Sequence, residues 1–194
     1  MAHAPQAPSA AEALARLKQG NRAYAQALHH HRLVDAELRE LLAEQGQCPY
    51  AVVLACADSR VVPEHIFSAG LGELFTIRVA GNVAGPSQVA SAVYAAEHLG
   101  TRLVVVLGHT GCGAVGAVLA GADDEALAPV VEPIGQAVQQ AGAQHDERAA
   151  TCANVAAAVQ RLQAEPALAQ LAATEGLLVA GALYNTASGE VEWL

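Results

Sequence analysis

Residues 103–113 read LVVVLGHTGCG, in which five aliphatic side chains run directly into a glycine-rich segment that holds one histidine and one cysteine. A short apolar run that is rich in valine and bounded by glycine is typical of a strand covered on both faces. We therefore predict a central strand over residues 103–107, followed by a turn and a helix of small residues. Strands of this kind belong to parallel sheets with helices on both faces.

Similar apolar runs stand on either side of this segment. They predict three further strands, over residues 50–55 (YAVVLA), 74–79 (LFTIRV) and 177–183 (LLVAGAL). Helices are predicted over residues 87–99 and through residues 153–171, and a turn over residues 185–189 leads into residues 191–194. Strands that alternate with helices predict the α/β class, here a single domain with a mainly parallel β-sheet flanked by helices.

The start of the chain predicts an N-terminal helical extension. Residues 1–10 are rich in Pro and Ala and are expected to form a flexible tail, which leaves residues 11–194 for the α/β domain. Ser9 and Glu12 have the spacing of a capping box, which predicts the start of a helix. Gly20-Asn21 is expected to interrupt that helix.

A second helical run is predicted over residues 35–45. His29, His30 and His31 lie between the two helices. A histidine tract can bind metal, but a solvated turn is the favoured interpretation here.

The composition narrows the classes of partner. The 194 residues carry a formal net charge of −9, with ten Lys and Arg residues scattered along the chain, and this argues against a nucleic-acid partner. The first 15 residues lack the features of a secretory signal, so a cytoplasmic location with reduced cysteines is expected. Residues 103–122 contain no Asp, Glu, Lys or Arg, yet His109, Thr110 and Cys112 near their middle argue against a membrane span.

Two of the predicted strands end in reactive side chains. Residues 56–60 (CADSR) follow one strand and residues 108–113 (GHTGCG) follow another. Ligands of open parallel sheets collect beyond the carboxyl ends of the strands, so we expect both segments in one crevice. Cys56, His109 and Cys112 form a set that suits Zn²⁺, one ion per chain, and three protein ligands leave a fourth position open for chemistry.

Asp58 and Arg60 stand close to this predicted zinc site. Zinc brings the pKa of a bound water from about 16 to about 7, and Asp58, held ionised by Arg60, is expected to orient the resulting hydroxide. Asp58 has a second option, because a carboxylate this close to the ligands is able to become the fourth ligand itself.

Other interpretations of the same residues remain open at this point. Residues 111–116 match G-x-G-x-x-G, the dinucleotide fingerprint, with Glu132 near the position of the ribose-binding acid. A Cys–His hydrolase and a structural zinc closed by Cys48 or Asp58 are further alternatives. We rank them lower, because the first leaves Cys56, Asp58 and His109 unexplained and the second leaves Cys56 idle. The third lacks a clear fourth ligand. Cys48 and Cys152 are otherwise interpreted as small core residues.

The two reactive segments together resemble a known family. C-x-D-S-R followed by G-H-x-x-C-G is similar to the signature of the beta-class carbonic anhydrases. The resemblance continues through residues 60–63 (RVVP), 72–78 (GELFTIR), 80–82 (AGN), 181–184 (GALY) and 188–189 (SG). It implies reversible hydration of carbon dioxide to bicarbonate and a proton by attack of zinc-bound hydroxide, and a homodimer or a multiple of dimers. It carries over Cys56, His109 and Cys112 as metal ligands, and Asp58 with Arg60 as the catalytic dyad.

The resemblance also implies a substrate pocket. Gln47 matches the amide that lines the carbon dioxide pocket in the plant-type branch, and Phe75 and Tyr94 match its aromatic residues, with the tyrosine supplied by the partner subunit. The other bacterial branch has a tryptophan where this chain has Val53, so we expect bicarbonate to act as a simple product. Hydrolysis of carbon disulfide and a non-catalytic zinc module are the alternative functions.

His98 is a candidate for proton transfer. It stands four residues after Tyr94, so the two side chains share one face of the helix predicted over residues 87–99. An unperturbed histidine has a pKa of about 6.5, close to that of a zinc-bound water. The alternative is a helix histidine packed at a subunit contact.

Overall fold

The computed structural model describes residues 7–27, 36–122 and 124–194. In these residues five strands form one sheet in the order β2-β1-β3-β4-β5. Their bounds are β1 Ala51–Ala55, β2 Leu74–Arg78, β3 Leu103–His109, β4 Leu178–Tyr184 and β5 Val191–Trp193. The first four strands are parallel and β5 returns antiparallel to β4, so the predicted mainly parallel sheet is confirmed. Every residue of β1 and β3 is buried, as their unbroken apolar sequences predict.

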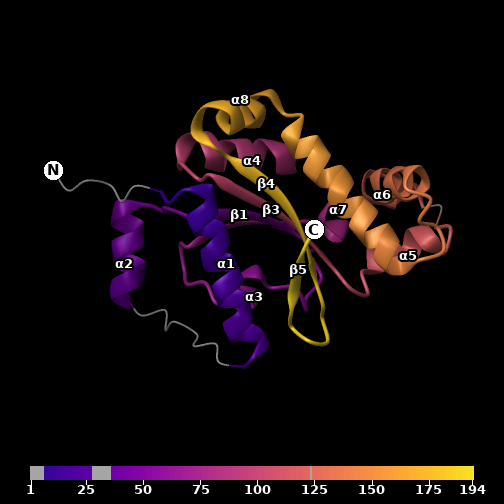
Figure 1. The fold of residues 1–194 in the computed structure, drawn as a ribbon, viewed down its shortest axis with the longest axis horizontal. Coiled ribbons are helices and arrows are strands. Elements are labelled where there is room, and N and C mark those ends of the chain that lie inside the picture. Colours follow the sequence, from indigo (N-terminus) through magenta and orange to yellow (C-terminus); the bar gives the residue numbers. More distant parts are fainter. Residues whose placement is uncertain (1–6, 28–35, 123) are drawn as a thin grey trace.

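Helices cover both faces of this sheet (Figure 1). The helices of the described residues are α1 Ala10–Ala25, α2 Ala36–Gln45, α3 Pro63–Ile66, α4 Pro86–His98, α5 Gly113–Leu119, α6 Ala128–Gln140, α7 Glu147–Gln163 and α8 Pro166–Glu175. Short 3-10 turns occupy Ala80–Asn82 and Glu125–Leu127. The predicted helix over residues 87–99 and the helical run over residues 35–45 correspond to α4 and α2.

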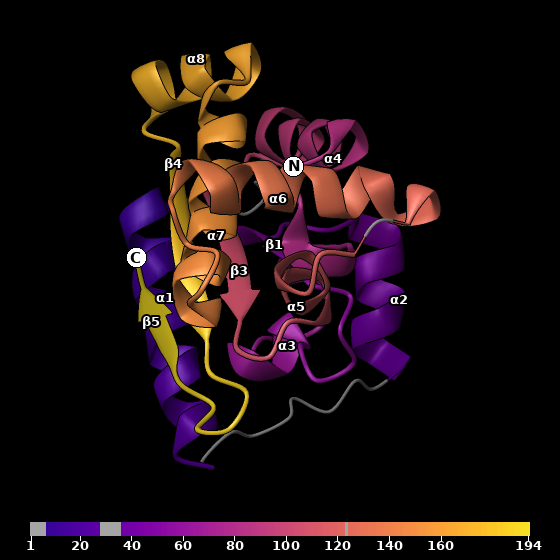
Figure 2. The same cartoon turned by 90° about the vertical axis from the view of Figure 1, so that its right-hand side faces the viewer.

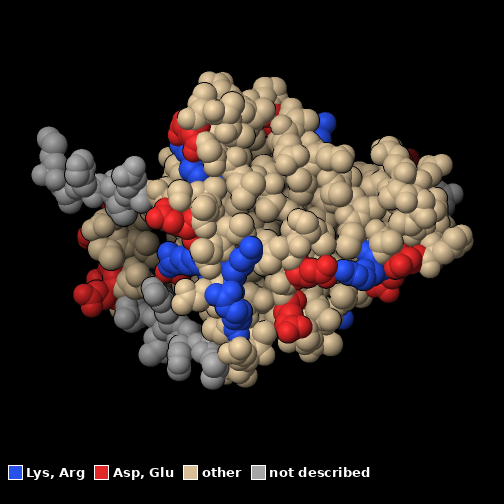
Figure 3. Space-filling view, viewed as in Figure 1, with Lys and Arg blue, Asp and Glu red and all other residues tan. Residues whose placement is uncertain are grey.

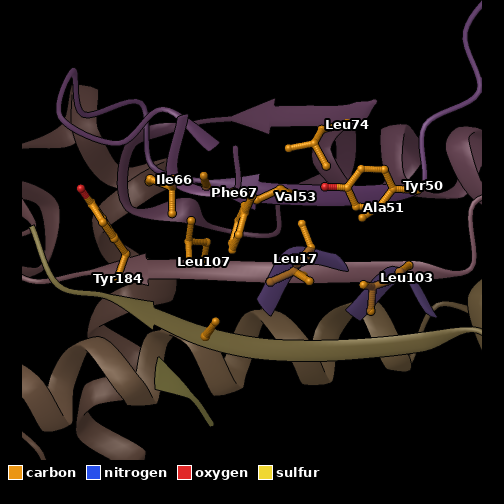
Figure 4. Close-up of a cluster of buried hydrophobic side chains, with 14 of the residues drawn as sticks. Leu17, Tyr50, Ala51, Val53, Ile66, Phe67, Leu74, Leu103, Leu107 and Tyr184 are labelled. Carbon is orange, nitrogen blue, oxygen red and sulfur yellow. The ribbon is translucent and has the colours of Figure 1, made fainter. Parts of the chain in front are cut away.

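Alternate side chains of the central strands pack against different helix layers. Val53 of β1 and Leu107 of β3 pack with Leu17 of α1 and Phe67 beside α3 (Figure 4). Their sequence neighbours face the other way: Val52, Leu54, Val104 and Val106 pack against α4, α7 and α8. Both layers bury aliphatic side chains, which fixes the orientation of each strand in the sheet.

The expected break at Gly20-Asn21 is wrong, because α1 continues to Ala25. A Cβ at Gly20 would lie 1.8 Å from the carbonyl oxygen of Phe67, so glycine is needed here for close packing. The buried Asn21 side chain donates to the carbonyl of Gly189 at 2.8 Å and accepts from the amide of Val191 at 2.9 Å. Gly20-Asn21 is therefore the point where α1 docks onto the rest of the protein.

Other expectations about the elements have mixed outcomes. The capping box at Ser9 and Glu12 is confirmed at the start of α1. The helical region predicted through residues 153–171 is two helices, because Pro166 begins α8 and cannot continue α7. Residues 185–189 form a turn that leads into β5, as predicted. The tail expected over residues 1–10 falls largely outside the described residues, as do His29, His30 and His31.

Residues 103–122 resolve into β3, a turn and α5. No helix in the described ranges has the length and apolar character needed to span a bilayer. On the face drawn in Figure 3, blue basic and red acidic side chains are interspersed. Arg148 and Glu192 form one exposed ion pair, at 2.8 Å.

The packing of α1 generates a test of the fold. We expect Gly20→Ala to lower the free energy of unfolding by about 1–3 kcal/mol, because the new Cβ has no space beside the Phe67 carbonyl. Gly135→Ala in α6 is the matched control, since its Cβ would meet only Val118 at 3.8 Å. Removing that helix glycine should raise stability by about 0.5–1 kcal/mol. Chemical denaturation of both variants measures the two effects, and equal stability of the two would contradict this account of α1.

Candidate metal centre

Three ligand-type side chains converge at the carboxyl edge of the sheet. Cys56 follows β1, His109 ends β3, and Cys112 stands immediately before α5. Because β1 and β3 are adjacent and parallel, their carboxyl ends lie side by side, next to α3 and α5 (Figure 2). The ligand atoms of the three residues lie within 4.8 Å of one another. We call residues 56–60 and 108–113 the two ligand loops.

The three side chains lie in a dry environment, since Cys56, His109 and Cys112 are 5%, 0% and 2% exposed. Cys56 Sγ accepts hydrogen bonds from the backbone N–H groups of Asp58 at 3.4 Å and Gly81 at 3.3 Å. A hydrogen bond from the Cys112 thiol, with these amides, lowers the pKa of Cys56 to about 4 despite its burial. Donating to the Cys56 thiolate raises the pKa of Cys112 well above its usual value, and burial adds to that effect.

The imidazole of His109 is held for ligation. Its Nδ1 lies 3.0 Å from the Thr110 carbonyl oxygen, which only accepts, so Nδ1 carries the proton. Nε2 is then left with a lone pair, and it is buried without a hydrogen-bond partner among the described residues. Burial lowers the pKa of His109, but the Cys56 thiolate, the Thr110 carbonyl and the Asp58 carboxylate together raise it on balance.

This arrangement fits a soft divalent cation. A buried lone pair beside a thiolate is unfavourable by itself, because buried polar atoms need a partner. A metal ion satisfies the imidazole and both sulfurs at once. The second ring nitrogen, bonded to a backbone carbonyl, has the partner that metal-bound histidines usually have. Two cysteines and one histidine suit zinc and leave one coordination position open.

Asp58 and Arg60 form the ion pair that the sequence predicts beside the ligands. Asp58 Oδ1 accepts from Arg60 N at 2.9 Å and Nε at 3.0 Å, and Oδ2 accepts from Nη2 at 2.7 Å. These hydrogen bonds hold the pKa of Asp58 well below its usual range. Arg60 Nη2 also donates to the Gly111 carbonyl at 3.0 Å, which ties the pair to the other ligand loop.

Arg78 is a contributor that the sequence reasoning did not identify. Its Nε donates to the carbonyl of Cys56 at 3.2 Å and its Nη2 to the carbonyl of Asp58 at 2.7 Å. Arg78 ends β2, which neighbours β1, and it therefore holds the first ligand loop from the side. The available signal was its place at the end of a predicted strand, within a motif shared with the resembled family.

The predicted pocket residues do not join this centre within one chain. Gln47 precedes β1, whose five residues span about 16 Å before Cys56 is reached. Figure 1 places α2, next to Gln47, at the opposite end of the molecule from α5. Phe75 pairs with Val52, four residues before Cys56. Its ring lies 6.2 Å from that of Tyr94, which is 49% exposed.

His98 also lies away from the ligand loops of its own chain. It is the last residue of α4. The first residue of that helix, Pro86, closely follows the Ala80–Asn82 turn beside Cys56, and His98 lies about 18 Å further along the helix. Its ring is 5.2 Å from the ring of Tyr94, so the two share a helix face as expected.

The structure weakens the other interpretations of the motifs. Glu132 lies exposed within α6 rather than at the end of a strand, where a ribose-binding acid stands. Cys48 is exposed and precedes β1, so it lies at the edge of the sheet opposite to the ligand loops. The interpretation of Cys48 as a core residue is therefore wrong, and Cys152 is partly exposed on α7.

The fold and the site together define an α/β protein with a Cys–His–Cys group, able to hold a metal ion, at the carboxyl edge of a parallel sheet. The family model described as carbonic anhydrase matches residues 51–191. The carbonic anhydrase of Mycolicibacterium smegmatis is 35% identical over 185 residues, covering 91% of this chain and 89% of that protein. The chain belongs to the carbonic anhydrase family, and within it to the beta class.

Other relatives extend the comparison. Carbonic anhydrase 2 of Mycobacterium tuberculosis is 44% identical over 111 residues, which cover 57% of this chain and 53% of that protein, so the match spans about half of its length. Among solved structures, the beta-carbonic anhydrase CafA of Aspergillus fumigatus has a TM-score of 0.75 at 29% identity, covering 95% of this chain and 89% of that one. Tetrameric beta-carbonic anhydrases from Sordaria macrospora share the fold, with a TM-score of 0.74 at 24% identity and coverage of 91% and 93%.

The geometry of the centre predicts which residues bind the metal. We expect one zinc ion per chain, and we expect Cys56→Ala, His109→Ala and Cys112→Ala each to lose most of it, because each removes a converging ligand atom. Cys152→Ala is the matched control and should retain full zinc, since its sulfur lies outside the cluster. Elemental analysis of purified protein checks the prediction. A full complement of zinc in Cys56→Ala would contradict the ligand assignment.

Proposed function

We propose that this protein binds one zinc ion through Cys56, His109 and Cys112 and catalyses the reversible hydration of carbon dioxide to bicarbonate and a proton. The observation that carries the proposal is the buried Nε2 lone pair of His109, which has no hydrogen-bond partner in the described part of the chain and lies beside two sulfurs. Membership of the beta-carbonic anhydrase class supports the same reaction. The proposed catalytic unit is a single domain over residues 11–194.

When bound, zinc supplies Lewis acidity, which lowers the pKa of a water molecule to about 7 and makes hydroxide available near neutral pH. Asp58 has the role of orienting this nucleophile. Its Oδ2 accepts one hydrogen bond from Arg60, which leaves a lone pair for a second donor. A nucleophile that donates a hydrogen bond to Asp58 keeps its proton and directs its own lone pair away from the carboxylate and toward carbon dioxide.

Arg60 keeps Asp58 ready for this role. Its fork holds both carboxylate oxygens, so the carboxylate stays ionised and keeps one orientation. With both oxygens held, Asp58 is directed to Arg60 rather than into the ligand cluster, which comprises only Cys56, His109 and Cys112 among the described residues. This supports the open fourth position over ligation by Asp58.

The pocket residues are proposed to act on the partner's centre. Gln47, Phe75 and Tyr94 lie too far along the sheet to reach the ligand loops of their own chain, so a pocket role requires a second copy. That requirement is met by a homodimer, or a multiple of dimers, in which the surface formed by Gln47, Phe75 and Tyr94 faces the partner's ligand loops. His98, beside Tyr94, is the proposed proton relay for the same centre. A cytoplasmic location is proposed because thiolate ligands must stay reduced.

The activity and the dyad are tested together by stopped-flow measurement of carbon dioxide hydration. Zinc-loaded protein should hydrate carbon dioxide. Asp58→Ala and Arg60→Ala should retain zinc yet lose about 10–100-fold in kcat/KM, because the side chains that they remove act on the nucleophile rather than on the metal. Arg16→Ala, which removes an ion pair with Glu73 of 2.6 Å elsewhere on the surface, is the control and should stay active.

The alternatives give different results in this assay. Carbon disulfide hydrolysis without carbon dioxide hydration would favour a related hydrolase, and zinc binding with neither activity would indicate a non-catalytic module. Near-normal rates for Arg60→Ala would show that Arg60 forms only an ordinary surface ion pair.

Sharing of the pocket between subunits predicts complementation. Gln47→Ala and Asp58→Ala should each be poorly active alone, but a mixed dimer has one centre with both an intact dyad and an intact Gln47 from the partner. Random pairing of equal amounts should restore about a quarter of wild-type activity, because half of the dimers are mixed and each has one complete centre. Co-expression followed by the carbon dioxide assay measures this. Activity no higher than the mean of the two variants would place Gln47 outside the partner's site.

A further inference from the structure

Helix α7 lies directly behind the candidate metal centre. Gly108 precedes His109, and a Cβ at this glycine would lie 2.6 Å from Val155 Cγ2 and 3.2 Å from Thr151 Cγ2. Both of these side chains belong to α7. The missing side chain of Gly108 therefore lets α7 press against the end of the strand that carries the imidazole ligand.

Two polar side chains on α7 reach the neighbourhood of all three ligands. Glu147 and Asn154 are seven residues apart, close to two helical turns, so they project from the same side of the helix. Glu147 Oε1 accepts from the backbone N–H of Gly111 at 2.9 Å. Asn154 Nδ2 donates to the carbonyl of Gly81 at 2.8 Å, and this side chain is buried.

The contact of Glu147 acts on the second ligand loop. Gly111 stands between His109 and Cys112 and has a φ of 65°, so the loop turns sharply at this residue. Its N–H is held by Glu147 and its carbonyl by Arg60. The peptide groups on both sides of Gly111 are thus held by hydrogen bonds, and with them the spacing of the two ligands.

The contact of Asn154 acts on Cys56. Gly81 has a φ of 66° and donates its N–H to Cys56 Sγ at 3.3 Å. A Cβ at Gly81 would lie 2.7 Å from Ile134, so the turn is packed closely as well as bonded. Asn154, by holding the carbonyl of Gly81, orients the amide that this turn presents to the thiolate.

We propose that Glu147 and Asn154 are positioning residues that pre-form the metal centre from α7. One sets the separation of His109 and Cys112, and the other directs a backbone amide at Cys56. The inference rests on the proposed metal binding and extends it to residues that contact no ligand side chain. Helix α7 thus supports ligands that come from two separate segments of the chain, the two ligand loops.

Zinc affinity and the spectrum of bound Co²⁺ test the role of these residues. Chelator competition on the apoprotein should show that Glu147→Ala and Asn154→Ala weaken zinc binding by about 10–100-fold, the usual effect of losing a partner of the ligands. The visible absorption of the Co²⁺-substituted variants should change in position or intensity, because the ligand geometry changes. Glu147→Gln keeps a carbonyl acceptor and should restore both properties close to wild type.

A second variant and two controls separate positioning from general stability. Asn154→Asp keeps the size of the side chain but removes the N–H donor, so it should weaken zinc binding even where Asn154→Ala folds poorly. Asn21→Ala removes a comparable buried amide in α1, and Arg148→Ala removes an exposed ion pair in the same turn as Glu147. Both controls should keep wild-type zinc affinity and the wild-type Co²⁺ spectrum, whatever their melting temperatures.

The proposal is overturned if Glu147→Ala and Asn154→Asp bind zinc as tightly as wild type with an unchanged Co²⁺ spectrum, or if the controls lose affinity equally. Wild-type protein that binds no zinc would refute the proposed function itself, and the positioning role with it. Metal binding is measured without turnover. A wild-type protein that binds zinc but does not hydrate carbon dioxide would therefore refute only the proposed activity, and the positioning role of Glu147 and Asn154 would still stand.

Discussion

The register of β1 against β3 decides whether the candidate metal ligands of this chain can meet. Ala55 of β1 pairs with Leu107 of β3. Cys56 lies one residue beyond this pair and His109 two residues beyond it, so both side chains stand at the same edge of the sheet. A slip of one residue would turn every side chain of β1 to the other face of the sheet. The two helix layers resist such a slip, because each packs against its own set of aliphatic side chains. The hydrophobic alternation that builds the core therefore also sets the distance between the first two ligands.

Gathering two sulfurs and an imidazole in a dry pocket has an energetic cost, and the backbone around them reduces it. Buried charge is tolerated where hydrogen bonds replace the lost water. Two backbone amides supply this at Cys56, while Arg78 holds the carbonyls of the same loop. Gly81 and Gly111 adopt positive φ values that allow the turns to aim their peptide groups correctly. The lone pair on His109 Nε2 has no hydrogen-bond partner among the described residues, and a cation bound between the ligands would satisfy it.

The sequence predicted the features that depend on local chemistry. The buried strands followed from unbroken aliphatic runs, and the convergence of Cys56, His109 and Cys112 followed from the rule that parallel strands end at one edge. What the sequence could not show was packing between distant segments. Gly20 was interpreted as a helix break because glycine disfavours helices, whereas the Phe67 carbonyl 1.8 Å from its would-be Cβ requires a glycine within α1. The contacts of Glu147 and Asn154 could not be predicted either, since the sequence of α7 does not indicate which loops the helix contacts in the folded protein.

The exposure of the centre differs sharply between its parts. The ligand side chains are almost fully buried within one chain, whereas the Arg60 side chain is 55% exposed and that of Asp58 20%. Electrostatic orientation of a nucleophile is weak in contact with bulk water and much stronger once water is excluded. The single chain supplies all three candidate metal ligands and the groups that support them. Catalysis, on the proposed function, depends on the assembly, because a second copy must cover the Asp58–Arg60 pair and bring its own Gln47, Phe75 and Tyr94 to that face. The aromatic surface left exposed around Tyr94 is then the counterpart of the dyad left exposed at the other end of the sheet, and pairing two chains buries both.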